Sequence, residues 1–305
     1  MVEKVIILGG GPAGLSAAIY TAREGFQPLV ISGFAAGGQL MLTTLVENIP
    51  GFPDGITGPD FVMQMRKQAE KFGTRFIDSN ATAVDLKSRP FKVAVDGDMH
   101  ETETLVIATG ANAKWLGIDS EKAFIGHGVS SCATCDGALF RNKNVIVVGG
   151  GDTAMEDSTF LTRFAKSVTI VHRHDSFKAS KIMSDRVLKN PKIKVIWNSA
   201  IIEIKGDVSV KSVSIRNLSS NKITEMPIDG VFVAIGHAPN TEIFKGQLDL
   251  AQNGYISTVD EVLTNIKGVY VAGDVADNFY RQAATASGSG VKAALRVREY
   301  FQGKE

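Results

Sequence analysis

Residues 4–14, KVIILGGGPAG, decide the fold class of this chain. The apolar residues from Val5 to Leu8 predict a buried strand, and the glycines that follow predict a tight turn. The stretch LSAAIYTAREG (15–25) predicts a helix that ends at Gly25. A second strand, PLVIS (28–32), comes next. This order of strand, glycine turn, helix and strand opens a doubly wound α/β fold.

The same order recurs further along the chain, where NVIVVGGGDTAME (144–156) precedes the strand SVTIVHR (167–173). Small-residue turns, ATG (108–110) and AIG (234–236), end two further strands and mark crossings between domains. A chain of 305 residues also favours two domains over one. We therefore predict two Rossmann-like nucleotide-binding domains of three-layer ββα architecture, the second inserted in the first. The first comprises residues 1–113 and 241–305, and the second comprises residues 114–240.

The composition excludes several classes of partner. Charged residues make up 21% of the chain and the formal net charge is +1, which favours neither nucleic acid nor an anionic membrane. No apolar run approaches the roughly 18 residues that span a bilayer, and the N-terminus has no signal-peptide pattern. We therefore expect a cytoplasmic protein. In that compartment structural disulfides are rare, and a close cysteine pair tends to be catalytic or metal-binding.

The first glycine turn has the spacing of a dinucleotide fingerprint, with Gly9, Gly11 and Gly14 at its three positions. The first glycine allows the tight turn, the second lets the backbone approach a pyrophosphate, and the third lets helix pack on strand. An acidic residue usually ends the next strand and holds the adenosine ribose. Here Ser32 stands at that place.

The second fingerprint (149–154) has alanine at its last position, an accepted variant. The strand after it ends in HRHDSFK (172–178), where Arg173, His174 and Lys178 could surround a 2′-phosphate. That favours NADPH over NADH, and a solvated basic loop is the alternative. Two dinucleotide sites in one chain predict a nicotinamide dinucleotide together with FAD.

Residues near the C-terminus also fit a flavin. Asp274 follows the strand GVYVAGD (268–274) and could accept hydrogen bonds from the flavin's sugar-alcohol chain. A helix expected from about Arg281 would direct its positive end at the electron-accepting edge of the flavin.

The only two cysteines, Cys132 and Cys135, stand two residues apart. A zinc site needs four ligands, and the five histidines are scattered, so we expect no metal. A structural disulfide here would close almost no loop and gain little stability. A redox dithiol remains, because closely spaced thiols at a helix start have a lowered pKa on at least one sulfur. Asp136 is a candidate proton donor or acceptor, a helix N-cap, or both.

The chain resembles the low-molecular-weight thioredoxin reductases along essentially its whole length. The resemblance rests on ordered motifs: GGGPAGLSAAIY, GGQLMLTTLVENIPGFP, ATGANAKWLG, CATCDG, VVGGGDTAMED, VFVAIGHAPN and AGDVADNFYRQAATASGSG. High-molecular-weight flavin disulfide reductases carry their cysteines shortly after the first fingerprint, where this chain has GGQLMLTT. Here the pair precedes the second fingerprint, as in the small reductases.

The resemblance implies a homodimer that binds FAD and NADPH and reduces thioredoxin. Cys135 would be the cysteine nearer the flavin, Cys132 its partner and Asp136 the acid–base residue. The implied cofactor-binding residues are Gly9, Gly11, Pro12, Ala13, Gly14, Ser32, Gly33, Gly38, Gln39, Asn48, Ala108, Thr109, Gly110, Gly273, Asp274, Arg281, Gln282 and Ala283, with Gly149, Gly151, Asp152, Thr153, Ala154, His172, Arg173, His174, Lys178, Ile235 and Gly236.

One departure concerns the NADPH loop. The family usually shows two adjacent arginines and then a third, whereas this chain has Arg173, His174 and Lys178. A histidine is only partly charged at neutral pH, and lysine lacks arginine's planar fork. We therefore predict weaker discrimination of NADPH from NADH than is typical, and a pH-dependent one.

The implied path takes a hydride from NADPH to the flavin, then electrons to the Cys132–Cys135 disulfide, then to a disulfide of the partner. The nicotinamide and the dithiol cannot both contact the same face of the flavin at the same time. We therefore expect rotation of the inserted domain about crossings near 111–115 and 237–241.

Four other functions compete with this interpretation. A flavin-dependent dithiol oxidase, or a reductase of another small redox protein, would use the same scaffold. A ferredoxin-fed relative would have a degraded second fingerprint, which is intact here. A non-catalytic redox sensor would not need a dithiol, Asp136 and a complete NADPH site together.

Overall fold

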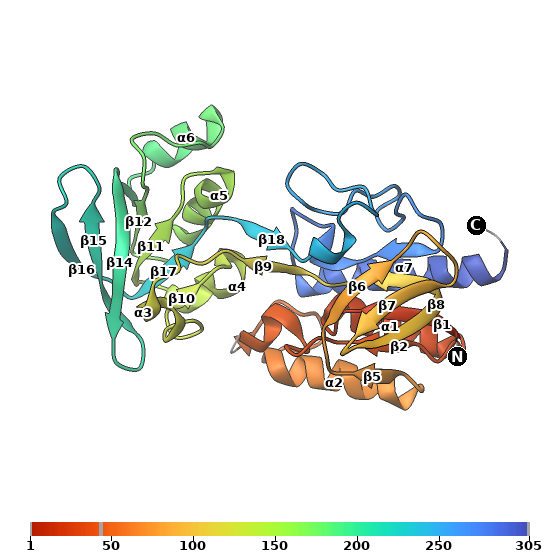
Figure 1. Cartoon of the computed structure of the whole chain (residues 1–305). Helices are drawn as coiled ribbons and strands as arrows, with labels where there is room; N and C mark the ends of the chain where they lie inside the picture. The colour runs from red at the N-terminus through yellow and green to blue at the C-terminus, as the bar shows by residue number, and fades with distance from the viewer. Residues whose placement is uncertain (1, 43–44, 304–305) are drawn as a thin grey trace. The chain divides into compact units, whose positions relative to one another are not determined.

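The computed structural model describes residues 2–42 and 45–303 (Figure 1). It contains two compact units. Unit 1 consists of Met1–Asn112 and Ala238–Glu305, and unit 2 of Ala113–His237. The chain therefore passes between the units twice. The two crossing segments, strands β9 (Ala111–Ala113) and β18 (His237–Pro239), form a small two-stranded sheet of their own.

Unit 1 is built on one large sheet with strand order β5-β2-β1-β8-β7-β6, and β19 pairs with β8. Its parallel part comprises β5 (Arg75–Ile77), β2 (Leu29–Ile31), β1 (Val2–Leu8), β8 (Asp98–Ile107) and β19 (Val269–Val271). An antiparallel part adds β7 (Phe91–Val95) and β6 (Ala81–Asp85). The helices are α1 (Pro12–Arg23), α2 (Gly58–Lys71) and α7 (Ala283–Phe301), and the shorter elements are η1 (Gly38–Leu42), β3 (Leu45–Val46), β4 (Ile56–Thr57), η3 (Glu242–Phe244) and η4 (Gly273–Val275).

The central parallel strands of unit 1 are apolar over their last residues, Val5–Leu8 of β1 and Leu105–Ile107 of β8, because those residues are buried on both faces of the sheet. One face packs on α1 and α7 around Tyr270 and Ile7. The other face packs around Phe91 and Phe244. The helices and loops cover the faces of the sheet, and the glycine turn follows the C-terminal end of β1.

Unit 2 has three layers. A parallel sheet of order β10-β17-β11-β12-β13 lies between helices and a three-stranded antiparallel sheet, with separate apolar cores on its two faces. The parallel strands are β10 (Val129–Ser130), β17 (Gly230–Val233), β11 (Asn144–Val148), β12 (Ser167–Val171) and β13 (Ile193–Ile196). The remaining elements are α3 (Asp119–Lys122), α4 (Ala133–Asp136), η2 (Gly137–Phe140), α5 (Asp152–Leu161), α6 (Lys181–Leu188), β14 (Ser199–Gly206), β15 (Val210–Asn217) and β16 (Ile223–Pro227). The predicted α/β fold class is confirmed.

Two predicted helix ends need comment. Gly25 follows α1 with a φ of 79° and donates its N–H to Ala22, as a C-terminal glycine does. The last helix begins at Ala283 rather than near Arg281. Arg281 has a left-handed φ of 48°, and Gln282 caps the helix, so the helix starts later than predicted.

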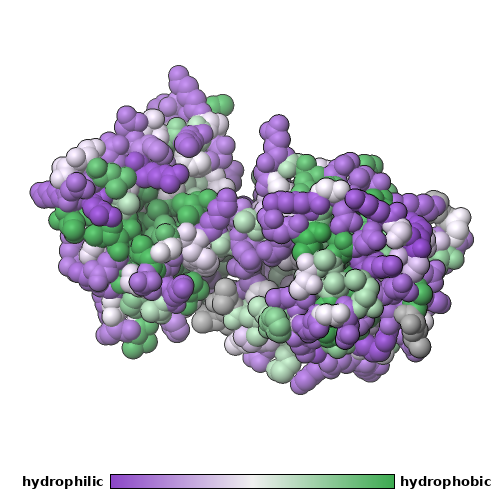
Figure 2. Space-filling view, in the orientation of Figure 1, coloured by the Kyte–Doolittle hydropathy of each residue, from purple (hydrophilic) through white to green (hydrophobic). Residues whose placement is uncertain are grey.

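The surface is mixed in character. Figure 2 shows hydrophilic residues over most of the visible face, with smaller apolar areas on each unit. Within residues 2–42 and 45–303, no helix combines the length and apolar character needed to cross a membrane.

Candidate active site

The first glycine turn is closed by backbone on one side and open on the other. A Cβ on Gly9 would lie 2.1 Å from the carbonyl oxygen of Ala108, and one on Gly14 would lie 2.0 Å from that of Gly9. On Gly11, by contrast, a Cβ would have its nearest neighbour among the described residues 3.9 Å away. Helix α1 begins at the next residue. Its free N–H groups therefore border a space that suits a pyrophosphate.

Asp274 shows that a polar ligand fits beside this turn. Its Oδ1 atom is buried and has no hydrogen-bond partner among the described residues. The pKa of Asp274 is raised to about 7, chiefly by burial and also by the nearby charge of Asp277, while Arg281 opposes the shift. An unpaired buried oxygen is costly. Hydroxyl groups of a bound flavin's sugar-alcohol chain would supply the missing donors, so these residues fit FAD.

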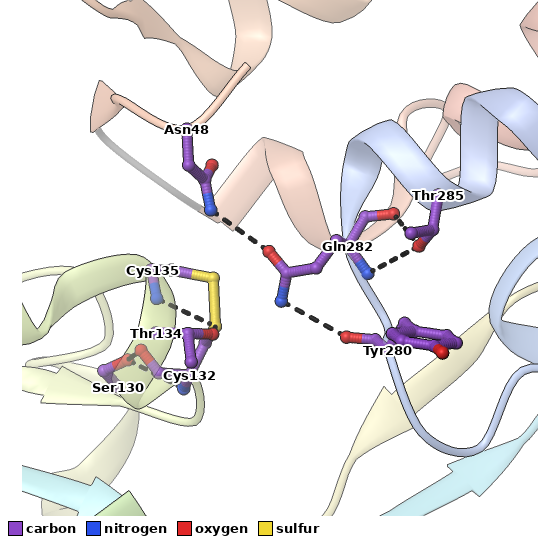
Figure 3. Close-up of a disulfide and its surroundings, with 8 residues drawn as sticks. All are labelled: Asn48, Ser130, Cys132, Thr134, Cys135, Tyr280, Gln282 and Thr285. Atoms are coloured by element: carbon purple, nitrogen blue, oxygen red, sulfur yellow. Dashed lines mark hydrogen bonds between the residues drawn. A yellow bond between two sulfur atoms is a disulfide. The ribbon is translucent and has the colours of Figure 1, made fainter. Parts of the chain in front are cut away.

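Two amide pairs connect other residues predicted for FAD. Asn48 donates from Nδ2 to Oε1 of Gln282 over 3.1 Å (Figure 3). Gln39 donates from Nε2 to Oδ1 of Asn112 over 3.2 Å. Residues far apart in the sequence are thus fixed at one edge of unit 1.

The remaining residues predicted for FAD lie on loops of unit 1. Ser32 and Gly33 follow β2, Gly38 begins η1, Ala108 to Gly110 follow β8, Gly273 begins η4 and Ala283 begins α7. Asn240, which the sequence did not identify, lies against this group. It donates from Nδ2 to the Thr109 carbonyl, while the Thr109 hydroxyl donates to the Asn240 carbonyl, each over 2.8 Å.

The second glycine turn is built in the same way. A Cβ on Gly149 would lie 2.3 Å from the Ala234 carbonyl oxygen, while one on Gly151 would have no neighbour within 4 Å in the described part of the chain. The basic loop is tied to this turn, because the backbone N–H of Lys178 donates to Gly150 O over 2.8 Å. Asp152, at the start of α5, accepts from the N–H of Ser180 over 2.8 Å.

His172 differs from its neighbours in this loop. It is buried, its Nε2 lies 3.1 Å from the carbonyl oxygen of Ser176, and its ring contacts Phe177 and Trp197. Burial lowers the pKa of His172, so the neutral ring is favoured. The buried ring thus packs on the inner side of the loop and stabilises its conformation. Arg173, His174 and Lys178 are exposed, where a phosphate could reach them.

Cys132 and Cys135 form a disulfide with an S–S distance of 2.06 Å (Figure 3). Cys132 caps α4, and the N–H of Cys135 donates to the Cys132 sulfur over 3.2 Å. The N–H of Cys132 in turn donates to Ser130 Oγ over 3.0 Å. A backbone donor on Cys132 Sγ stabilises negative charge there, so Cys132 is the sulfur better suited to be a thiolate.

Asp136 ends α4, directly after Cys135. Burial raises the pKa of this carboxyl, and a hydrogen bond with Ser130 partly opposes the shift. It therefore holds a proton to higher pH than an exposed aspartate, as an acid–base partner of thiols requires. The side chain makes no N-cap hydrogen bond to the following 3₁₀ turn, which removes the capping alternative. In the described ranges, no three side chains of histidine, cysteine, aspartate or glutamate are grouped to hold a metal ion.

Two glycine turns suited to dinucleotides and a disulfide beside a proton-holding carboxyl define a nucleotide-dependent disulfide oxidoreductase. The comparisons agree: a model of the pyridine nucleotide-disulphide oxidoreductase family matches residues 3–290. The chain is 51% identical to the thioredoxin reductase of Rickettsia prowazekii, covering 98% of both chains. It is 50% identical to that of Streptomyces coelicolor, covering 98% of this chain and 94% of the relative.

A solved structure gives the same answer. The crystal structure of thioredoxin reductase from Streptococcus pyogenes matches with a TM-score of 0.94 and 39% identity, covering 98% of each chain. This chain belongs to the thioredoxin reductases of the pyridine nucleotide-disulphide oxidoreductase family. The resemblance read from the ordered motifs is therefore confirmed.

Proposed function

We propose that the protein is an NADPH-dependent thioredoxin-disulfide reductase that works as a homodimer. The observation that carries the proposal is the Cys132–Cys135 disulfide, which lies in unit 2 with the carboxyl of Asp136 beside it in sequence. A pair so close in sequence adds little to stability, and both cysteines are partly exposed residues. These features suit a disulfide that opens and closes during turnover.

The two cofactors are assigned to separate units. FAD would bind unit 1 on the turn from Gly9 to Gly14, with Asp274 accepting from its hydroxyl groups. NADPH would bind unit 2 on the turn from Gly149 to Ala154, with the loop at 172–178 around its 2′-phosphate. Together the cofactors supply an electron pair to the disulfide. The residues of the protein would bind and orient the two cofactors, and Asp136 would exchange protons with the sulfurs.

The chemistry at sulfur follows from the contacts of Cys132. When two electrons and one proton enter, the S–S bond breaks and leaves one thiolate and one thiol. The N–H of Cys135 favours the thiolate on Cys132. This thiolate attacks a disulfide of thioredoxin and forms a mixed disulfide, and the displaced sulfur takes a proton from Asp136. The thiol of Cys135 then gives its proton to Asp136 and attacks the sulfur of Cys132, which restores the disulfide and releases the second thioredoxin sulfur as a thiolate that takes a proton from solvent.

Turnover also needs unit 2 to present the dithiol and the nicotinamide in turn. We expect it to rotate about the paired crossing strands β9 and β18, where few backbone angles need to change. A crosslink between the units should stop turnover and spare at least one half-reaction. Full activity in the crosslinked protein would refute the rotation.

An anaerobic assay tests the function directly. The purified protein is mixed with NADPH and a chromogenic aromatic disulfide, with and without thioredoxin. Colour that depends on thioredoxin supports the reductase. If NADPH bleaches the flavin and thioredoxin makes no difference, the cofactor sites stand and the partner is a different one. Electron transfer to oxygen in an aerobic control would indicate a dithiol oxidase.

A further inference from the structure

Ser32, which stands where an acidic residue was expected, has a carboxylate beside it. Strands β2 and β5 are parallel neighbours in unit 1, and each ends one residue before a polar side chain. Ser32 follows β2 and Asp78 follows β5, 46 positions later. The Ser32 hydroxyl donates to Oδ1 of Asp78 over 2.5 Å. The fold therefore brings an acid to the strand end that lacks one in the sequence.

Arg66 on α2 fixes the orientation of this carboxylate. Its Nη1 lies 2.7 Å from Oδ1 of Asp78 and its Nη2 lies 3.0 Å from Oδ2. The guanidinium also lies over the ring of Phe76, 4.3 Å from its centroid. A carboxylate held by a two-pronged guanidinium has a defined direction. Arg66 and Ser32 together lower the pKa of Asp78, so it remains an ionised acceptor.

This pair lies next to the first glycine turn. A Cβ on Gly10 would lie 2.8 Å from Cβ of Ser32, so turn and strand end are in close contact. A cavity of about 180 Å³ is lined by Gly10, Ser32, Arg66 and Phe76 with apolar side chains of α1 and α2. A dinucleotide whose pyrophosphate lies over Gly11 therefore reaches Ser32 with the next sugar.

The carboxylate of Asp78 remains accessible to a sugar. The side chain of Asp78 is 53% exposed, although Arg66 and Ser32 hold it. Oδ2 has one hydrogen bond, to Arg66, and a carboxylate oxygen accepts two. Ser32 itself is only 6% exposed, and its hydroxyl lies against Oδ1 of Asp78 and the carbonyl oxygen of Ile77, so it orients the carboxylate. A ribose hydroxyl group can thus donate to Oδ2 of Asp78.

We propose that Asp78, oriented by Arg66 and acting with Ser32, holds the ribose diol of the adenosine half of the dinucleotide bound on the first glycine turn. Asp78 would take the role that an acidic residue at the end of the second strand has in other folds of this class. The inference rests on the proposed function, which assigns FAD to this turn.

The test compares FAD with an analogue that lacks both hydroxyl groups of the adenosine ribose. The flavin-free full-length chain is titrated with each ligand, and binding is followed by flavin fluorescence. The wild type should bind the analogue about tenfold more weakly than FAD, because hydrogen bonds to a charged acceptor are lost. Asp78→Asn should bind FAD about tenfold more weakly than the wild type and bind both ligands nearly equally.

A matched control separates the ribose contact from loss of the ion pair. Glu70 also pairs with Arg66, over 3.1 Å. Glu70→Gln removes that ion pair and leaves Asp78 and Ser32 in place, so it should keep the wild-type preference for FAD. Ser32→Ala should lose part of the preference. Melting temperatures establish that the variants fold.

The outcomes distinguish this inference from the proposed function. A wild type that binds FAD and the analogue equally, or an Asp78→Asn variant that keeps the full preference, overturns the role of Asp78 and leaves the function intact. A wild type that binds neither ligand overturns the flavin assignment itself.

Discussion

Both glycine turns of this chain lead from a strand into a helix, and their surroundings differ. In unit 1 a Cβ on Gly14 would collide with the carbonyl of Gly9, and the next strand ends beside a carboxylate, Asp78. In unit 2 the matching position is Ala154, and the next strand ends in the exposed Arg173 and His174. Under the proposed cofactor assignment, either turn could hold a pyrophosphate. The side chains one strand away would then decide which dinucleotide each unit accepts.

The largest difference between the units is the dithiol, which only unit 2 contains. Cys132→Ser and Cys135→Ser should each lower thioredoxin reduction by at least about 1,000-fold, because covalent exchange is lost. Flavin content should stay at the wild-type level, since FAD is assigned to unit 1. Steady-state assays and the visible spectrum measure the two properties.

Thr134→Ser is the matched control, because the hydroxyl group beside Cys132 is retained. It should keep most of the activity. Substantial thioredoxin reduction in either serine variant would contradict the proposed path.

The third fingerprint position requires a different residue in each unit, so exchanging glycine and alanine should destabilise the protein in both cases. Gly14→Ala places a methyl group against the backbone of Gly9, which we expect to cost about 1–3 kcal/mol and to weaken FAD binding. Ala154→Gly removes a methyl group within α5 and should cost about 1 kcal/mol through helix propensity. Chemical denaturation and flavin content measure both. A Gly14→Ala variant that is as stable as the wild type would show that the two turns are equivalent.

The raised pKa of Asp274, a residue of unit 1, predicts that the free energy of unfolding depends on pH. In the flavin-free chain the folded state has this pKa raised to about 7, so it binds the proton more tightly than the unfolded state. The group's stabilising contribution is therefore full below about pH 4 and is lost as the pH rises through about 7. At about 1.4 kcal/mol per pKa unit, we expect the free energy of unfolding to fall by up to about 4 kcal/mol over this range.

Asp274→Asn supplies the control for this prediction, because it has nearly the same shape and does not ionise. Its unfolding free energy should vary less with pH than that of the wild type. Parallel profiles for the two proteins would exclude Asp274 as the cause. Added FAD should also flatten the wild-type profile, because hydroxyl donors favour the carboxylate.

The sequence was informative where structure is local. Strands, glycine turns and the pair of Cys132 and Cys135 could be predicted because their signals lie within a few residues. Asp78 and Asn240 could not be found in that way, since each reaches its neighbours only through the fold. Asp78 meets Ser32 across adjacent strands, and Asn240 meets Thr109 where the chain returns to unit 1. A burial pattern could not show the inward direction of His172 either, because that direction depends on the path of its own loop.

The smallest expected effect concerns the basic loop of unit 2 and tests whether its side chains set the choice of dinucleotide. The loop backbone is fixed, since Lys178 donates its N–H to Gly150, while His174 is exposed. His174→Arg should therefore raise the ratio of kcat/KM for NADPH over NADH by roughly three- to tenfold, through a permanent charge and a second donor. His127→Arg adds the same charge at another exposed position of unit 2 and should leave the ratio unchanged. If the ratio rose equally in both variants, the preference for NADPH would depend on the overall charge of unit 2 and not on this loop.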